Sequence, residues 1–167
     1  MRLGGRPTVP PIRPAVAMGL AAIAALVSDS AAAHLGGSAS SVTADRSRMA
    51  ARLSTVATGR FTRHELTRPN GGQVHEFTNA DGVVFAVAWS GPGKPDLATL
   101  LGPYFPTFQA NSVATARRMH SLRQPPRTAQ PNLQIQVGGH MGWFHGVAYI
   151  PSLAPAGFAV ADLAIQP

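Results

Sequence analysis

The chain has 167 residues, a length that fits one domain, and 45% of them are hydrophobic. It contains no cysteine, which excludes disulfides, thiolate metal sites and a thiol nucleophile. Its 14 basic and 7 acidic residues give a net charge of +7, and every basic residue except Lys94 is an arginine. The arginine excess suits an anionic ligand or an anionic envelope surface, and solubility with an arginine-rich codon usage is the simpler alternative.

The first 33 residues have the pattern of a secretory signal peptide. Three arginines precede an apolar run from Ala15 to Val27, and Ala31 and Ala33 occupy the small-residue positions before a cleavage site. The run has 13 residues, whereas a membrane-spanning helix needs about 20. We therefore expect cleavage near Ala33, a periplasmic or secreted protein, and no stable membrane span after cleavage. An uncleaved N-terminal anchor or a disordered tail is the alternative.

The mature chain would begin at His34 and would carry 11 basic and 6 acidic residues, because the signal peptide contains three arginines and one aspartate. We expect residues 34–59 to form a mobile linker and then a helix over 41–56. The helix is predicted because four apolar residues recur on one stripe with a period of 3.6, namely Val42, Met49, Leu53 and Val56. Residues 60–165 are then expected to form a single domain.

Two turn signals follow, Asn70-Gly71 and Asp81-Gly82, which suit tight hairpins because glycine and asparagine tolerate positive φ. They predict an antiparallel meander of three strands over Arg60–Arg68, Gln73–Asn79 and Val83–Ser90. The third strand is apolar at every position from Val83 to Trp89. A strand of this kind is usually covered on both faces, so we expect one structural layer on each side of the sheet.

The rest of the chain alternates between helical and extended patterns. We expect short helices over 97–102, where Asp96 can cap the first turn, and over 110–122, followed by a proline-rich loop over 123–131. A strand over 133–137 and a partner over 143–150 predict a C-terminal hairpin, and 159–165 is expected to be a short helix or an extended tail.

Two His-Glu pairs raise a question of register. If Asn70-Gly71 is a two-residue loop, His75 faces Leu66 and Glu65 faces Glu76. Like charges directly opposite one another are unfavourable. We therefore expect a bulge that shifts the register, an arginine such as Arg63 between the two glutamates, or a bound cation, the first two being the simpler explanations.

Four histidines are candidate metal ligands: His64, His75, His140 and His145. The His-Glu pairs lack the second histidine of an H-E-x-x-H zinc motif and lie on predicted strands rather than on a helix. His140 and His145 lie in "GGHMGWFHG", five residues apart, which places them on opposite faces of one strand. A structural or surface role is the simpler interpretation of both.

The sequence identifies no catalytic residue and no cofactor site. It has no G-x-S-x-G nucleophile motif. "GPGKPD" lacks the spacing of a phosphate-binding loop, and its two prolines remove backbone donors. The arginine-rich stretch over 117–127 has no interleaved aromatic residues, so we expect a solvated surface there and no nucleic-acid partner.

Two long segments resemble a known family. "HELTRPNGGQVHEFTNADGVVFAVAWSGPGKPDLATLLGPYF" and, later, "GGHMGWFHGVAYIPSLAPAGF" are similar to small exported proteobacterial proteins classed as the domain of unknown function 2844 family. The resemblance covers about Phe61 to Leu163. It implies a soluble exported domain with no assigned activity, cofactor or catalytic residue, so it supplies no site residues.

We therefore expect an α+β fold, in which an antiparallel sheet formed by the three-stranded meander and the C-terminal hairpin carries an N-terminal helix and short helices. The function favoured by the sequence is a non-enzymatic binding or accessory module of the bacterial envelope, with an envelope protein or an anionic ligand as partner. The alternative is a metal-binding protein or metal-dependent hydrolase that uses some of the four histidines.

Overall fold

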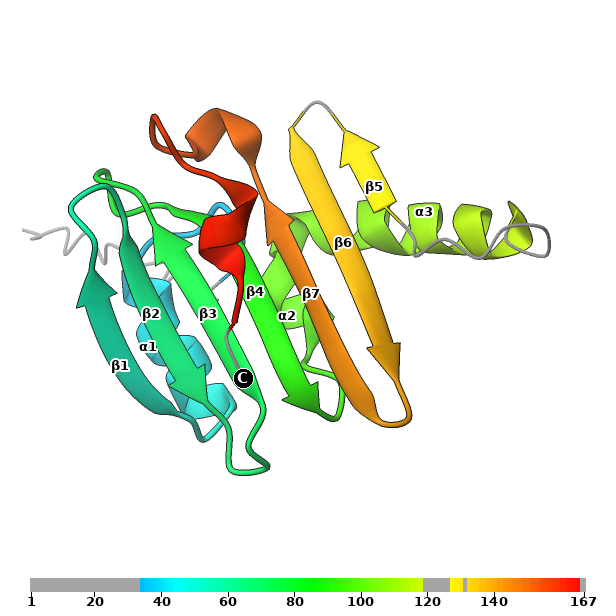
Figure 1. The fold of residues 1–167 in the computed structure, drawn as a ribbon, viewed down its shortest axis with the longest axis horizontal. Coiled ribbons are helices and arrows are strands. Elements are labelled where there is room, and N and C mark those ends of the chain that lie inside the picture. The colour runs from blue at the N-terminus through cyan, green and yellow to red at the C-terminus, as the bar shows by residue number, and fades with distance from the viewer. Residues whose placement is uncertain (1–33, 119–126, 131, 166–167) are drawn as a thin grey trace, which may run out of the picture.

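The computed structural model describes residues 34–118, 127–130 and 132–165. They form an α+β fold around one antiparallel sheet with the strand order β1-β2-β3-β4-β7-β6-β5 (Figure 1). The strands are β1 (Arg52–Ala57), β2 (Thr62–Thr67), β3 (Gln73–Thr78), β4 (Val84–Pro92), β5 (Arg127–Gln130), β6 (Leu133–His140) and β7 (Trp143–Tyr149). The helices are α1 (Ser40–Arg48), α2 (Leu97–Leu101) and α3 (Phe105–Arg118), with short 3-10 turns η1 (Gly102–Tyr104), η2 (Pro151–Leu153) and η3 (Val160–Leu163).

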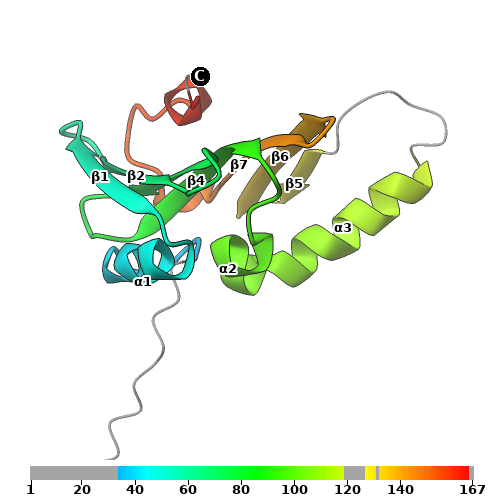
Figure 2. The same ribbon diagram turned by 90° about the horizontal axis from the view of Figure 1, so that it is seen from below.

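The sheet has a different cover on each face. All three α-helices lie on one side, which we call the helix face, and the C-terminal segment, residues 151–165, lies on the other, which we call the tail face (Figure 2). The strand pairing assigns side chains to these faces by alternation. Val74 and Trp89 point to the helix face, whereas Phe77 and Ala88 point to the tail face.

The strand β4 is buried on both sides, as its apolar sequence predicts. Residues 84–89 are all at most 3% exposed. Val87 and Trp89 pack in the core under the helices, and Phe85 and Ala88 pack in a second core under the C-terminal segment. The predicted meander and the C-terminal hairpin are both present, and pairing of β4 with β7 joins them into one sheet.

The predicted helix over 41–56 is wrong in its second half. The helix α1 ends at Arg48, Ala50 takes a positive φ of 48°, and the chain turns back as the edge strand β1. Leu53 and Val56 therefore do not belong to a buried helical stripe and are 36% and 38% exposed. Pairing with β2 satisfies the backbone of this segment, and this tertiary contact outweighs the local helical pattern.

The expected linker before α1 is also wrong, because residues 35–39 are bonded into the fold. The Leu35 side chain is fully buried, and its backbone N–H donates to the Leu100 carbonyl at 2.9 Å. The Gly36 N–H donates to the Val84 carbonyl at 2.7 Å. This segment attaches α1 to the start of β4.

The hairpin between β2 and β3 differs from the prediction by one residue. The Arg68 N–H donates to the Gly72 carbonyl at 2.8 Å, so the loop between them has three residues rather than two. Gly71 takes a φ of 82°, and the Asn70 side chain accepts a hydrogen bond from the Gly72 N–H. A three-residue loop that contains a residue at positive φ is the next commonest way to close a hairpin.

The shifted register removes the predicted opposition of two glutamates. Glu65 faces His75, and His64 faces Glu76. The shift was one of the expected resolutions. The Arg63 guanidinium pairs with the Glu65 carboxylate at 2.6 Å, but it does not lie between the two glutamates, because they are on opposite faces of the sheet. Glu76 is thereby turned to the helix face and Glu65 to the tail face.

Most of the remaining elements follow the prediction with shifted ends, but the strand β5 was predicted as loop. Asp96 caps α2 as expected, accepting from the N–H groups of Ala98 and Thr99. The helix α3 begins at Phe105, five residues earlier than expected, and β5 lies within the predicted proline-rich loop. Residues 160–163 form the 3-10 turn η3 rather than an α-helix.

Close packing between β4 and β7 supplies the first testable prediction. A Cβ atom at Gly146 would overlap the Trp89 ring and would lie 2.8 Å from the Gln136 carbonyl oxygen. The Trp89 side chain is 3% exposed and cannot move aside freely. Gly146→Ala should therefore lower the free energy of unfolding by about 2 kcal/mol, measured by urea denaturation. In a Trp89→Phe background the same substitution should cost clearly less, and equal costs in both backgrounds would contradict the packing argument.

Candidate ligand-binding face

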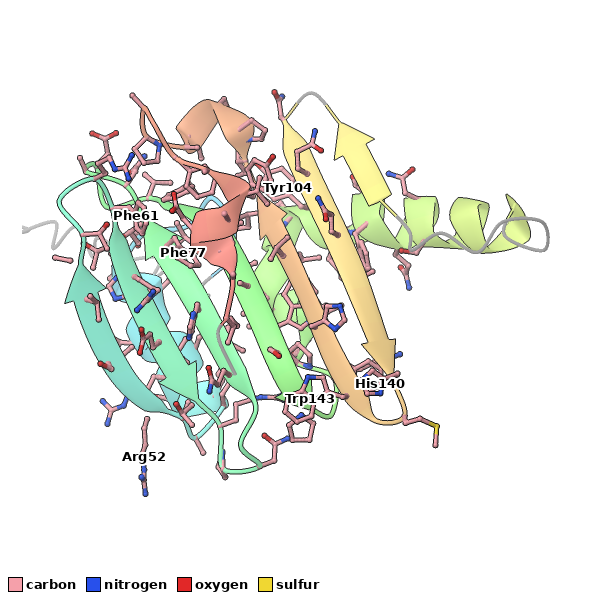
Figure 3. The ribbon with its side chains drawn as sticks, in the orientation of Figure 1. Arg52, Phe61, Phe77, Tyr104, His140 and Trp143 are labelled. Atoms are coloured by element: carbon pink, nitrogen blue, oxygen red, sulfur yellow. The ribbon has the colours of Figure 1, made fainter. Side chains whose placement is uncertain are left out.

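The C-terminal segment crosses the tail face and leaves a hollow on each side. The Leu163 side chain is fully buried and packs with the tail-face core around Phe61, Phe77 and Phe85. Phe61 and Phe77 lie beside the C-terminal segment in Figure 3. Ala164 lines both hollows, so η3 and the residues after it separate the two spaces.

The first space, the apolar hollow, lies over β4, β7 and β6 and has a volume of about 430 Å³. Its floor is aliphatic at Ala88 and Val147, and Leu163 and Ile165 close one side. Its polar side chains are Ser90, Gln136 and His145. A small site with an apolar floor and a few polar groups is the usual composition of a ligand pocket.

Ser90 and His145 are cross-strand partners in this hollow, a pairing that a serine nucleophile would need. The His145 ring, however, leans away from β4. A Cβ atom at Gly138, on β6, would lie 2.5 Å from His145 Nε2. The imidazole therefore covers the β6 backbone on the side opposite Ser90, and the pair lacks the geometry of a nucleophile and its base.

The second space, the polar hollow, lies over the β1–β2 turn, β2 and β3 and has a volume of about 660 Å³. Its charged side chains are Arg60, Arg63, Glu65 and Asp162. All four are held by protein contacts. Arg63 pairs with Glu65, Arg60 Nη1 donates to the Gly157 carbonyl at 2.6 Å, and Asp162 accepts from the Ala159 N–H. The Nε atom of Arg63 is buried and has no hydrogen-bond partner.

His75 lies in the wall of the polar hollow and is only 8% exposed. Its Nδ1 atom is buried and has no hydrogen-bond partner. Burial lowers the pKa of His75, Glu65 partly offsets that effect, and Arg63 adds to it, so the ring is neutral at neutral pH. A buried polar atom without a partner costs on the order of 1–3 kcal/mol, which a bound ligand can recover.

A pair of buried carboxyl groups lies on the other side of the sheet. Asp45 on α1 and Glu76 on β3 meet between the helix and the sheet, and their side chains are 0% and 1% exposed. None of their four carboxyl oxygens receives a hydrogen bond from another group. A proton held between the two carboxyls is the remaining donor, and it converts a repulsive pair into a hydrogen bond.

The surroundings of this acid pair only partly compensate its charge. Burial raises the pKa of Glu76 to about 8, and the charge of Asp45 adds to that effect. Burial also raises the pKa of Asp45 to about 6, although Arg48, whose Nη1 lies 3.6 Å from Asp45 Oδ1, opposes the rise. Asp96 adds a weaker repulsion. The pair is inaccessible to a substrate, so we treat it as a structural element that couples α1 to the sheet.

The four histidines that the sequence offers as metal ligands are not brought together. His64 faces the helix side, where its ring nitrogens lie 3.2 Å from the hydroxyls of Thr55 and Thr78, whereas His75 faces the tail side. His145 belongs to the apolar hollow. His140 lies with Trp143 at the β6–β7 turn (Figure 3). Within residues 34–118, 127–130 and 132–165, no group of three His, Asp or Glu side chains could hold a metal ion.

Sequence reasoning missed most of the residues that line the two hollows. Among them, Arg63, Glu65, His75 and His145 had been singled out, but for other roles. Asp45 and Glu76 were not paired, because their contact depends on the fold of α1 over β3. A three-residue hairpin loop places Glu76 on the helix side of the sheet, so the correct register could have indicated that Glu76 packs against a helix.

Comparison with known proteins identifies the family. The pattern of the family described as "Protein of unknown function (DUF2844)" matches residues 31–163. The chain belongs to this family. The match covers α1, every strand of the sheet and η3, so the DUF2844 domain includes the acid pair and most of the lining of both hollows, whereas Ala164 and Ile165 follow the matched residues. Searches of the curated proteins and of the solved structures find no match.

The DUF2844 chain has no helix, among those that the structure describes, that is both long enough and apolar enough to cross a bilayer. Its longest described helix is α3, with 14 residues.

The acid pair gives a pH-dependent prediction. Both folded-state pKa values lie above their ordinary values, so the pair contributes its full stability near pH 4 and loses it as the pH rises through about 6 to 8. Glu76→Gln keeps a donor for Asp45 at every pH, and should flatten this slope and stabilise the protein at pH 9 by about 2 kcal/mol. Denaturant titrations from pH 5 to pH 9 measure the effect.

The matched control for this prediction is Asp81→Asn, because Asp81 is an exposed carboxylate at the β3–β4 turn. It should leave the slope of stability against pH as it is in the parent protein. A parent protein that is more stable at pH 9 than at pH 5 would contradict the shared proton.

Proposed function

We propose that this DUF2844 chain is an exported, non-enzymatic module that binds a small ligand on the tail face of its sheet. The observation that carries the proposal is the pair of hollows beside the C-terminal segment, one of which contains a buried histidine atom without a partner. Buried polar groups without a partner are rare in folded proteins, and one that borders a hollow can be satisfied by a molecule bound there.

Two features support binding rather than catalysis. The His145 ring lies over β6, away from Ser90, so the apolar hollow has no activated nucleophile. In the polar hollow, Glu65 is paired with Arg63, and Asp162 accepts a hydrogen bond from the Ala159 N–H at 2.9 Å. Both carboxylates are engaged in holding the fold, which leaves them poorly suited to proton transfer.

The proposal of export rests on the first 33 residues. Their basic start, 13-residue apolar run and Ala-x-Ala ending have the pattern of a signal peptide, and the family resemblance points the same way. A periplasmic or secreted location follows, with an envelope component or an anionic small molecule as the partner. The net positive charge suits such a partner.

Export has a direct test. When the full chain is expressed in a bacterium, the protein recovered from the envelope fraction should begin at His34, as measured by intact mass and N-terminal sequencing. Ala31→Leu and Ala33→Leu should each cause the precursor to accumulate, because both positions require a small side chain. Ala32→Leu is the matched control and should be processed normally. Full-length protein retained in the cytosol would contradict the proposal.

Ligand binding can be tested on the protein recovered from the envelope fraction. A library of small acids, amines, sugars and aromatic compounds is screened by the amide chemical shifts of the ¹⁵N-labelled protein. We expect hits whose shifts cluster on residues that line the hollows. Ala164→Trp should block them, because Ala164 is exposed and borders both spaces.

The matched control is Val160→Trp on the same turn, since Val160 is 41% exposed and lines neither hollow. It should leave the hits unchanged. A screen without hits on the tail face, or hits that Ala164→Trp does not affect, would overturn the proposed function.

A further inference from the structure

The polar hollow has features that select among ligand classes. Its lining comes from segments far apart in the sequence: the β1–β2 turn at Arg60, strand β2 at Arg63, strand β3 at His75, and η3 at Asp162. The sheet and the C-terminal segment therefore have to fold together before the hollow exists. Its side chains are held in place by backbone that is already hydrogen-bonded, which favours a preformed site.

Two buried nitrogen atoms of the hollow have no hydrogen-bond partner, and they indicate which ligand group fits there. The Arg63 Nε–H is buried without an acceptor, and a guanidinium nitrogen can only donate. His75 Nδ1 is buried and unpartnered, and a neutral imidazole carries its proton on either nitrogen. A ligand atom that accepts hydrogen bonds can satisfy both.

The orientation of the two arginines also indicates the ligand group. Glu65 holds one end of the Arg63 guanidinium at 2.6 Å, and the Gly157 carbonyl holds Arg60 Nη1 at 2.6 Å. Each guanidinium has five N–H donors, so these contacts fix its plane and leave further donors for a ligand. Fixed, planar donors match the two oxygens of a carboxylate.

The charge balance and the apolar wall of the hollow also restrict the ligand class. Arg60 and Arg63 are balanced by Glu65 and Asp162, so the hollow is neutral overall and does not attract every anion. The Phe61 side chain lines the same hollow and offers a surface for a hydrocarbon group. The arrangement fits a molecule that has one carboxylate and an apolar body.

We propose that the polar hollow is a carboxylate-binding site in which Arg63, Arg60 and His75 bind the carboxylate and Phe61 contacts the apolar part of the ligand. This inference rests on the proposed binding function and names the ligand class. The carboxylate can come from a free organic acid or from the C-terminus of a peptide, since both present the same group.

The experiment uses the protein recovered from the envelope fraction and two pairs of probes. The first pair is 3-phenylpropionate and its amide, and the second is N-acetyl-alanyl-phenylalanine with a free or an amidated C-terminus. NMR signals of the Arg63 Nε–H and the His75 ring report binding at the hollow. We expect these signals to shift on titration with one or both acids, with a dissociation constant at least tenfold lower than that of the matching amide.

The substitution test is Arg63→Lys, which keeps the charge beside Glu65 but removes the Nε–H and the planar donors. It should weaken binding of the acids by about tenfold or more. Arg52→Lys is the matched control, because Arg52 lies at the far end of β1 and does not line the hollow (Figure 3). It should bind like the parent protein.

The outcomes separate this inference from the proposed function. Binding of either acid supports the inference. Binding of 3-phenylpropionate alone identifies a free organic acid as the source of the carboxylate, and binding of the peptide shows that a peptide C-terminus is also accepted. Amides that bind as well as acids, inorganic phosphate that binds as tightly, or an Arg63→Lys variant with parental affinity would overturn it. If the library hits fall in the apolar hollow while the acids fail, the carboxylate site is wrong and the binding function stands; if both screens fail, both proposals are wrong.

Discussion

Strand β4 lies between two apolar layers, and the rest of the structure depends on this arrangement. Its side chains divide between two cores, one under the helices and one under the C-terminal segment, and both are almost fully excluded from solvent. Burial of apolar side chains is the dominant favourable term in folding, so a strand with two apolar faces requires both covers at once. The C-terminal segment therefore has to return across the sheet, and its return forms the two hollows on the tail face.

The hairpin between β2 and β3 then assigns the chemistry of each face. A three-residue loop places His75 on the tail side with Glu65, and turns Glu76 toward α1. A shift by one residue would exchange the faces of these side chains. The same hairpin thus supplies the buried His75 to the proposed ligand site and the buried Glu76 carboxyl to the acid pair with Asp45. The binding face and the pH-dependent contact of α1 share one strand, β3, through its opposite faces.

Local sequence patterns predicted the elements that depend on interactions between residues close together in the chain. The meander was predictable because residues 83–89 are all apolar and glycine follows asparagine or aspartate at both turns. The cap of α2 was predictable because Asp96 precedes the helix directly and can accept from N–H groups of its first turn, here those of Ala98 and Thr99. The edge strand β1 was not, since Leu53 and Val56 fit a helical stripe as well as a strand, and only pairing with β2 distinguishes the two. The candidate site was the least predictable part, because its lining comes from the meander, the β1–β2 turn and the last residues of the domain.

The sequence by itself determined that the protein lacks cysteine, has an α+β fold and contains a central strand covered on both sides, and it carries the pattern of the DUF2844 family. Those features follow from composition, alternation and turn residues, which act over a few positions along the chain. Only the tertiary structure decided that Asp45 meets Glu76, that His145 turns away from Ser90, and that Arg63 and His75 share a hollow. These contacts join residues that are distant in sequence, and their geometry depends on strand register and on how each cover packs.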